Sequence, residues 1–277
     1  KELEKVIPNN YSGACWGYDF DWEARYTKIP AYQPTIVATG IICNALYLVN
    51  QIINHKKARE LIISATNFII KDLNRTTSGN SICFSYSPFD KQQVFNASMK
   101  GVRLLSQAYD LSGESNYIKI AKSAVEFVVE NQKKDGSWIY SLSKVGSWSD
   151  NYHTGYVLDC LDEYEKLSND DSYSNNINLG YSFYKNNFIT NEGIPKFYHN
   201  NIYPIDCTSA SQCILTLTRF GDIDKAKIVA KWIILNMQQD TGSFKFRKFK
   251  YYTIGNSYMR WSNAWMFTAL AKLRDIK

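Results

Sequence analysis

The chain has 277 residues, of which 45% are hydrophobic and 15% aromatic, and a formal net charge of +6. This length and apolar content predict one large core, and the scattered basic residues, without a basic run interleaved with aromatics, do not indicate a nucleic-acid-binding protein. The longest apolar runs, such as residues 35–49, are interrupted by Asn44 and are too short to cross a bilayer, so we expect no membrane span.

Helical periodicity predicts nine helices along the chain. They cover residues 34–53, 56–72, 94–110, 116–132, 151–167, 172–188, 208–219, 223–239 and 260–274. Short strand-like alternation is confined to the Trp- and Tyr-rich connections, such as residues 137–142 and 244–249.

The helices recur in pairs that end in the same turn. The clearest copies are residues 124–138 and 230–244, which share all their offsets, and weaker copies begin at Ala65 and Gly180. A small residue is followed by an apolar pair on the expected buried face, then by a Gln that reaches the helix end, a Gly that ends the helix and an aromatic residue that fills the gap. A repeat of this length is typical of stacked helical hairpins.

Small residues mark the odd-numbered helices as an inner layer, and Lys and Glu on one face mark the even-numbered helices as an outer layer. The expected fold is therefore all-α, an α/α toroid of the six-hairpin type, in one domain over residues 1–277. Only five inner helices are counted, and residues 1–7 resemble the tail of an outer helix, so we expect an N-terminal hairpin to be lacking. An open or five-membered ring closed by the first 30 residues is the alternative.

In such a ring the residues before each inner helix gather at one end, which is the expected position of a cleft. These segments are rich in Trp and Tyr, with a few carboxylates, Asn and Arg. Aromatic rings stack on sugar faces and the polar groups bind hydroxyls or a uronate, so the composition favours a carbohydrate over a polyprenyl chain. The expected substrate-binding residues are Trp16, Asp21, Trp22, Arg25, Tyr86, Trp148, Asn151, Asp206, Arg260 and Trp261.

Residues 150–153, Asp-Asn-Tyr-His, form the sharpest local cluster. His153 is a candidate general acid or base tuned by a carboxylate. Asp150 is equally suited to cap the helix that follows it. Glu23 is the third catalytic candidate, and Glu23 and Arg25 form either a substrate-contacting pair or a surface ion pair.

The six cysteines form no Cys-x-x-Cys pair, and they are interpreted as small buried thiols of a reducing compartment, which favours the cytoplasm. A zinc site of Cys207, His153 and an Asp has no support in the spacing. We therefore expect no metal and no cofactor.

The Gln-x-x-x-Gly-Ser-Trp copies resemble the QW motif of terpenoid cyclase and protein prenyltransferase toroids, which implies the same fold. The cyclase Asp-x-Asp-Asp acid is absent, and residues 19–22 match it only in part. The prenyltransferase zinc pattern is not met either, because Asp206 and Cys207 are adjacent. A terpenoid-type activity therefore does not follow from the resemblance.

Residues 15–22, 34–39 and 150–159 resemble a group of bacterial and archaeal proteins associated with exopolysaccharide and surface-glycan biosynthesis. Related toroids include glucuronyl C5-epimerases, polysaccharide lyases and unsaturated glucuronyl hydrolases. The resemblance implies a glycan or sugar-linked ligand and partners from the same biosynthetic pathway.

Two functions compete on this basis. An enzyme would use either two carboxylates for hydrolysis, Asp150 with Glu23 or Asp206, or a base and a Tyr or His acid for epimerisation or elimination, with Arg25 or Arg260 as a clamp. The alternative is a non-catalytic toroid that binds a glycan or scaffolds its partners.

Overall fold

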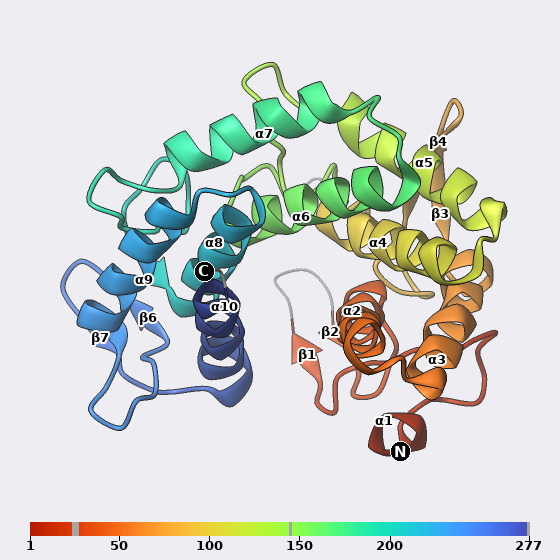
Figure 1. Cartoon of the computed structure of the whole chain (residues 1–277), viewed down its shortest axis with the longest axis horizontal. Coiled ribbons are helices and arrows are strands. Elements are labelled where there is room, and N and C mark those ends of the chain that lie inside the picture. Colours follow the sequence, from red (N-terminus) through yellow and green to blue (C-terminus); the bar gives the residue numbers. More distant parts are fainter. Residues whose placement is uncertain (24–27, 144–145, 276–277) are drawn as a thin grey trace. The chain divides into compact units, whose positions relative to one another are not determined.

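The computed structural model describes residues 1–23, 28–143 and 146–275. Each of the nine predicted helical ranges contains a helix, and Figure 1 shows their order along the chain. The α-helices are α1 (Glu2–Lys5), α2 (Ile36–Ile53), α3 (Lys56–Asn67), α4 (Phe95–Ser112), α5 (Ser115–Glu130), α6 (Asn151–Ser168), α7 (Ser174–Asn187), α8 (Cys207–Arg219), α9 (Ile223–Met237) and α10 (Trp265–Arg274). The π-helical segment η1 (Phe68–Asp72) continues α3, and η2 (Met259–Ala264) leads into α10.

The strands are short and antiparallel. They are β1 (Trp22–Glu23), β2 (Lys28–Ile29), β3 (Arg75–Ser78), β4 (Ser81–Phe84), β5 (Ile205–Asp206), β6 (Arg247–Lys248) and β7 (Thr253–Ile254). β6 falls in the predicted segment 244–249, whereas segment 137–142 contributes a single bridge from Ser141 to Val94. The sequence analysis did not predict the β3–β4 hairpin, whose turn places Gly79 at a φ of +56°.

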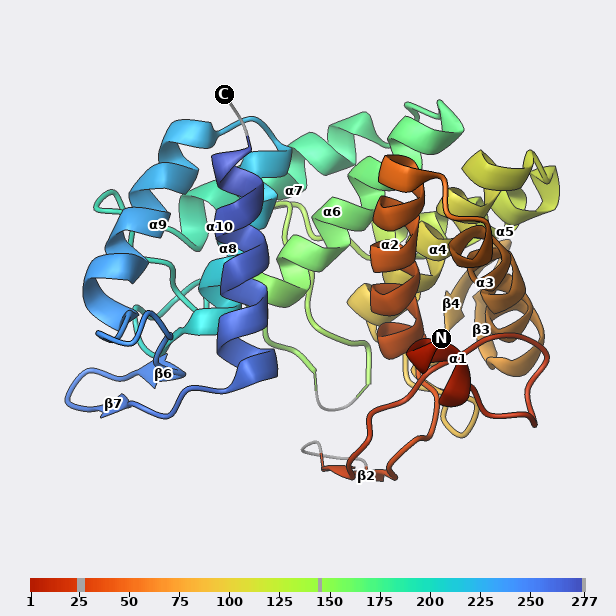
Figure 2. The ribbon, with the colours of Figure 1, turned by 60° about the horizontal axis from the view of Figure 1, so that its bottom comes forward.

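The described residues divide into two compact units. Residues 1–132, 141–147 and 160–174 form the first, and residues 133–140, 148–159 and 175–277 form the second. In the first unit α2 packs on α3 and α4, as the turned view in Figure 2 also shows, and α4 packs on α5. In the second unit α8 packs on α9 and α10. Each unit therefore contains helical hairpins of the predicted kind.

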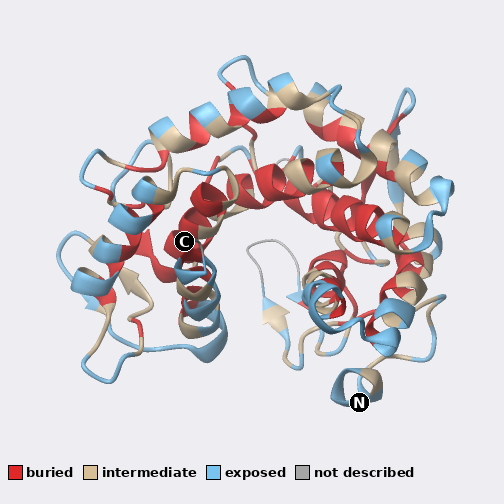
Figure 3. Cartoon of the chain, in the orientation of Figure 1, coloured by how far each residue is buried: buried red, intermediate tan, exposed pale blue. Residues whose placement is uncertain are grey.

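Two of the predicted inner helices, α4 and α8, are the most buried, whereas α2 and α10 keep exposed faces. Figure 3 shows α4 and α8 almost wholly buried, while α3, α5 and α9 keep one exposed face. Small residues allow the close packing: a Cβ on Gly40 would lie 2.9 Å from the Cβ of Lys100, and one on Gly155 would lie 2.9 Å from the Cγ of Gln212. Replacing either glycine would push apart a pair of inner helices.

The repeated turn has the predicted structure. Gly136, Gly193 and Gly242 adopt φ values of +91°, +83° and +82°, and the plugging residues Trp138 and Phe244 are buried. In one part the prediction was wrong. Ile234, expected on the buried face of its repeat, is 40% exposed because it borders an open groove between α9 and α10.

Helix α2 is longer than the apolar run read from the sequence. Its 18 residues have a mean hydropathy of 1.8, enough in length and composition for a bilayer span. Of this helix 44% is buried within the protein, and core helices of soluble proteins can have the same length and hydropathy. The absence of a membrane span stays a prediction.

Asp170 joins three segments of the first unit. Its carboxylate accepts hydrogen bonds from the Tyr164 hydroxyl and from Ser172, and it pairs with Lys122 on α5 at 2.9 Å. Burial alone would raise the pKa of Asp170, but the bonds from Ser172, Lys122 and Tyr164 outweigh burial and hold this pKa well below its usual value.

We expect Asp170→Asn to lower the free energy of unfolding by roughly 1–2 kcal/mol at pH 7. Because the folded-state pKa lies below the unfolded value of 3.8, this stabilisation is present above that value and is lost as the pH falls through the folded pKa. Urea unfolding of both proteins at pH 7 and pH 2.5 measures the difference. A difference that is the same at both pH values would contradict the role of the charge.

The six cysteines are free and buried, as predicted. Burial raises the pKa of Cys15, Cys83, Cys207 and Cys213 to about 12 in each case. We therefore expect no native cysteine to react with a thiol reagent at pH 8 before the chain unfolds, since the thiolate is the reactive form. Absorbance titration with and without denaturant tests this, and rapid labelling of the native protein would contradict it.

Candidate functional site

Asp150 organises the start of α6. One carboxylate oxygen, Oδ1, accepts a hydrogen bond from the backbone N–H of His153 at 3.0 Å, which caps the helix. The other, Oδ2, lies 2.7 Å from Nδ1 of the His153 ring and accepts a bond from Nε1 of Trp148 at 3.0 Å. The two roles considered for Asp150, helix cap and partner of His153, are therefore filled at once.

The environment of this pair is aromatic. The His153 ring lies 4.0 Å from the Tyr152 ring and 4.5 Å from the Tyr140 ring, centroid to centroid, and Tyr140 stacks on Trp148 at 5.1 Å with an angle of 8°. The Asp150 side chain is 1% exposed, whereas that of His153 is 20% exposed. Only the imidazole of this pair is therefore accessible to a ligand.

The geometry sets the tautomer of His153. The carboxylate oxygen Oδ2 accepts a hydrogen bond, so Nδ1 of the neutral imidazole carries the hydrogen and Nε2 keeps a lone pair. Trp148 Nε1 donates to the same oxygen, which restricts rotation of Asp150. An imidazole oriented in this way can take up and return a proton at Nε2.

Tyr152 adds a hydrogen-bond donor. Its burial, together with the nearby carboxylates Asp150 and Asp206, raises its pKa well above the usual value. The phenol therefore stays protonated at neutral pH and can donate a hydrogen bond to a developing negative charge.

Asp206 serves the structure of the second unit. Its Oδ1 accepts a bond from the backbone N–H of Ser209 and caps α8, and its Oδ2 accepts bonds from Nε and Nη2 of Arg247 at 2.9 and 2.7 Å. The Arg247 guanidinium lies 5.4 Å from the Phe197 ring, which in turn is 5.7 Å from Tyr152. Burial raises the pKa of Asp206, although Arg247 opposes this. Both oxygens are occupied, and the residue is 3% exposed.

Two other candidates are buried in packing roles. Asn151 is fully buried, donates from Nδ2 to the Lys196 carbonyl and accepts the Tyr184 hydroxyl. Trp16, in the first unit, is 1% exposed and donates from Nε1 to the Leu3 carbonyl. In these positions both side chains hold neighbouring segments together.

Candidates at the N-terminal loop belong to the first unit. Asp21 and Glu23 each lie 3.4 Å from Lys28, and Asp21 also accepts the backbone N–H of Ala31. Trp22 lies 6.0 Å from Tyr18 in an aromatic cluster. Glu23 forms a surface ion pair with Lys28, and the pairing of Glu23 with Arg25 stays a prediction.

The remaining candidate ligand contacts are Arg25, Tyr86, Arg260 and Trp261. Arg25 lies outside the described residues. Tyr86 is half-buried and accepts the Ile36 backbone N–H through its carbonyl. Arg260 and Trp261, in η2 of the second unit, are exposed, and the Trp261 carbonyl accepts the Thr208 hydroxyl. Their roles as ligand contacts stay predictions.

Tyr140 lies in one of the segments expected at the cleft, although it was not among the expected substrate-binding residues, and sequence reasoning assigned no site to Tyr156 or Arg247. Tyr152 and Tyr156 are spaced by four on α6, a helical signal that could have added Tyr156 to the cluster. Arg247 had no such signal, because its position depends on the pairing of β5 with β6.

Helix α4 carries a polar stripe, of which sequence reasoning missed Arg103 and Gln107. Asn96, Arg103 and Gln107 are spaced so that they share one helix face, and each is more than nine-tenths buried. Asn96 Oδ1, Arg103 Nε and Gln107 Oε1 find no hydrogen-bond partner in the part of the chain that the structure describes. Buried polar atoms are normally satisfied, so this stripe is suited to a polar ligand.

Several solved structures have a similar fold. A sugar epimerase from a ruminal bacterium matches with a TM-score of 0.74 and 11% identity, over 99% of this chain and 82% of that chain. Cellobiose 2-epimerase from Bacillus thermoamylovorans B4167 matches with 0.73 and 11%, over the same shares. Unsaturated glucuronyl hydrolase from Bacillus sp. GL1 matches with 0.67 and 11%, over 87% and 74%.

These likenesses confirm the predicted α/α-toroid fold. No family model and no curated protein matches the sequence. The resemblance to the surface-glycan group and the single-domain organisation stay predictions.

We expect Asp206→Ala to lower the free energy of unfolding by about 3 kcal/mol, because it removes a helix cap and leaves the Arg247 charge without its partner. Asp240→Ala, at an exposed position, is the matched control and should change stability by no more than about 0.5 kcal/mol. Denaturant unfolding of both variants gives the comparison, and equal effects would show that the ion pair is unimportant.

Proposed function

We propose that this protein is an enzyme that binds a sugar at the start of α6 and transfers a proton through His153. The observation that supports the proposal is the pair of Asp150 and His153, with a buried carboxylate, a partly exposed imidazole and a wall of stacked aromatic rings. The similarity to sugar epimerases and a glucuronyl hydrolase supports a sugar-related reaction.

Proton transfer fits the second unit better than glycoside hydrolysis. Hydrolysis needs a carboxylic acid and a carboxylate that both face the scissile bond. Asp150 and Asp206 instead use their oxygens on a helix cap, His153, Trp148 and Arg247. Epimerisation, isomerisation or elimination requires a base that removes a proton next to a carbonyl or carboxylate, and His153 can supply it.

In the proposed reaction Nε2 of His153 removes the carbon-bound proton beside the sugar carbonyl. Asp150 stabilises the imidazolium that forms and keeps Nδ1 protonated, as buried carboxylates do in other catalytic pairs. The protonated Tyr152 phenol hydrogen-bonds to the developing enolate oxygen, and Trp148 and Tyr140 offer their faces to the sugar ring. Return of the proton from Nε2 completes the exchange, so no other reactant is consumed.

The substrate is a glycan or a sugar-linked precursor, and we place the reaction in polysaccharide assembly in the cytoplasm, with enzymes of the same pathway as partners. The aromatic rings around His153 support a sugar over a polyprenyl chain. A toroid that binds a glycan without turnover is the second candidate, since the aromatic wall would serve that function equally.

Exchange of a carbon-bound hydrogen in D₂O tests the proposal directly. Mannose, glucose, cellobiose and glucuronate are incubated with the protein, and the loss of the proton signal next to the carbonyl is followed by NMR. We expect the wild type to exchange the hydrogen of at least one sugar. In His153→Gln the exchange rate should be at least about 100-fold lower than in the wild type, the usual loss when a general base is removed.

Asp150→Asn separates catalysis from folding, because Asn is also a good helix cap but cannot hold the same imidazole tautomer. It should still fold, with a lower melting temperature because an amide nitrogen in the place of Oδ2 cannot accept the Trp148 hydrogen bond, and it should lose most of the exchange rate. His55→Asn, which replaces a histidine cap of α3 in the other unit, is the matched control and should exchange at the wild-type rate.

Two results would decide against the proposal. Wild-type exchange that persists in His153→Gln would exclude His153 as the base. Sugar binding, detected by calorimetry and weakened by Trp148→Ala, without exchange of any sugar would favour the non-catalytic candidate.

A further inference from the structure

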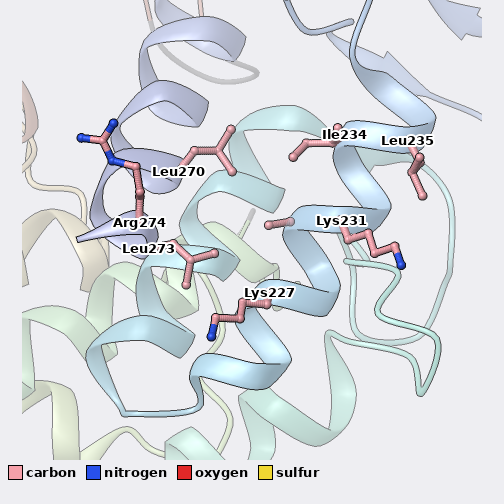
Figure 4. Close-up of a pocket in the computed structure, with 8 residues that line it drawn as sticks. Lys227, Lys231, Ile234, Leu235, Leu270, Leu273 and Arg274 are labelled. Atoms are coloured by element: carbon pink, nitrogen blue, oxygen red, sulfur yellow. The ribbon is translucent and has the colours of Figure 1, made fainter. Parts of the chain in front are cut away.

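A groove of about 480 Å³ runs between α9 and α10 in the second unit. Figure 4 shows the side chains that border it, from one turn after another of the two helices. They are Lys227, Ala230, Lys231, Ile234, Leu235, Leu270, Leu273 and Arg274. The function proposed for His153 uses none of these residues.

The floor of the groove is apolar and its charged rim is basic. Ala230 and Leu273 are buried at 4% and 8% exposure, whereas Ile234 and Leu235 remain 40% and 72% exposed. Every charged residue that lines the groove is a cation, and among the described residues Arg274 forms an ion pair with the exposed Asp275 at 3.7 Å. An apolar surface with this rim suits a partner that is apolar on one side and acidic at one end.

The internal repeat indicates which kind of structure binds to the exposed face of an outer helix. In the aligned copies, Gly180 of α7 corresponds to Ala230 of α9, so Tyr181 corresponds to Lys231. Tyr181 donates its hydroxyl to Asp222, the residue before α9, and Lys185 pairs with the same carboxylate at 2.9 Å. In this copy, therefore, the outer helix binds an acidic residue at the start of the next outer helix.

The preceding copy also joins an outer helix to a carboxylate, although from another position of the repeat. Lys122 on α5 pairs with Asp170, which lies four residues before the start of α7. In these two copies the outer helix offers a hydrogen-bonding or cationic group to a carboxylate near the N-terminal end of the next outer helix. Acidic groups are favoured at that end because the helix dipole is positive there.

Packing in the second unit follows the same rule. Ile228 of α9 lies against the turn after α7, where a Cβ on Gly193 would come within 2.4 Å of the Ile228 Cγ2. The α9 helix therefore packs beside α7, and Tyr181 and Lys185 of α7 bind Asp222 at its N-terminal end. Lys231, at the position of Tyr181, offers the same anchor on α9, beside an apolar surface that remains exposed.

We propose that the groove between α9 and α10 binds an α-helix of a partner protein, with an apolar face and a carboxylate at its N-terminal end. The apolar face covers Ile234, Leu235 and Leu270, and the carboxylate pairs with Lys231. Lys227 and Arg274 bind further acidic residues of the same helix. This interaction is independent of the sugar chemistry proposed for α6.

The test uses a fluorescein-labelled peptide with the sequence of residues 170–187, which is the chain's own example of such a helix with its leading acids. A lactam bridge between positions 178 and 182, both exposed in α7, keeps it helical. We expect saturable binding to the whole protein, measured by fluorescence anisotropy. Lys231→Glu and Leu235→Asp should each weaken it at least tenfold, while Lys119→Glu, exposed on α5, should leave it unchanged.

A charge swap makes the test specific. A peptide with Asp170→Lys and Asp171→Lys should bind more weakly to the wild type and more tightly to Lys231→Glu than to the wild type. Leu235 and Lys231 are both exposed, so their variants should keep the wild-type melting temperature.

Three results would overturn the proposal. The first is no saturable binding at millimolar peptide, or binding that Lys231→Glu and Leu235→Asp do not change. The second is a wild-type dimer in sedimentation that Leu235→Asp converts to a monomer, which would assign the groove to a second copy of this chain. The third is binding to phosphatidylserine vesicles that Leu235→Asp abolishes, which would assign it to a lipid surface.

Discussion

The second unit depends on how one buried carboxylate is shared. Asp150 caps α6 with one oxygen and holds both His153 and Trp148 with the other, so the position of the helix, the orientation of the imidazole and the placement of the indole are linked. A buried carboxylate is costly to desolvate and is stable here because donors surround it. The same donors leave His153 as the member of the pair that can contact a ligand. Structural stability and proposed chemistry therefore rest on one set of bonds.

Asp206 shows the contrast. It occupies the corresponding place before α8 and is equally buried, yet its second oxygen is bound by Arg247, not by an imidazole. Two carboxylates at the starts of neighbouring predicted inner helices thus have different functions. The partner on the adjacent segment decides which one supports a proton carrier. This difference favours a single-base reaction over one that needs two carboxylates.

Much of the architecture could be predicted because it follows from local patterns. Helix positions depend on a period of 3.6 residues, and the repeated turns depend on glycines that adopt positive φ. The candidate pair was found because Asp150 and His153 are three residues apart at a helix start. Arg247 was not found, because its contacts cross from another segment. Asp206 was taken as a ligand contact since its partner, 41 residues away, has no sequence signature.

The sequence by itself determined the helical hairpins, their order and the identity of the helix that carries the Asp-His pair, because these depend on periodicity, glycine turns and capping. Tertiary structure alone decided which polar side chains are hydrogen-bonded or ion-paired within the protein and which remain accessible to a ligand. Exposure separates His153 from Asp150, and packing between hairpins separates the covered apolar faces from the open groove beside α9. The physical reason is that helix formation is governed by neighbours along the chain, whereas burial and charge pairing are governed by neighbours in space.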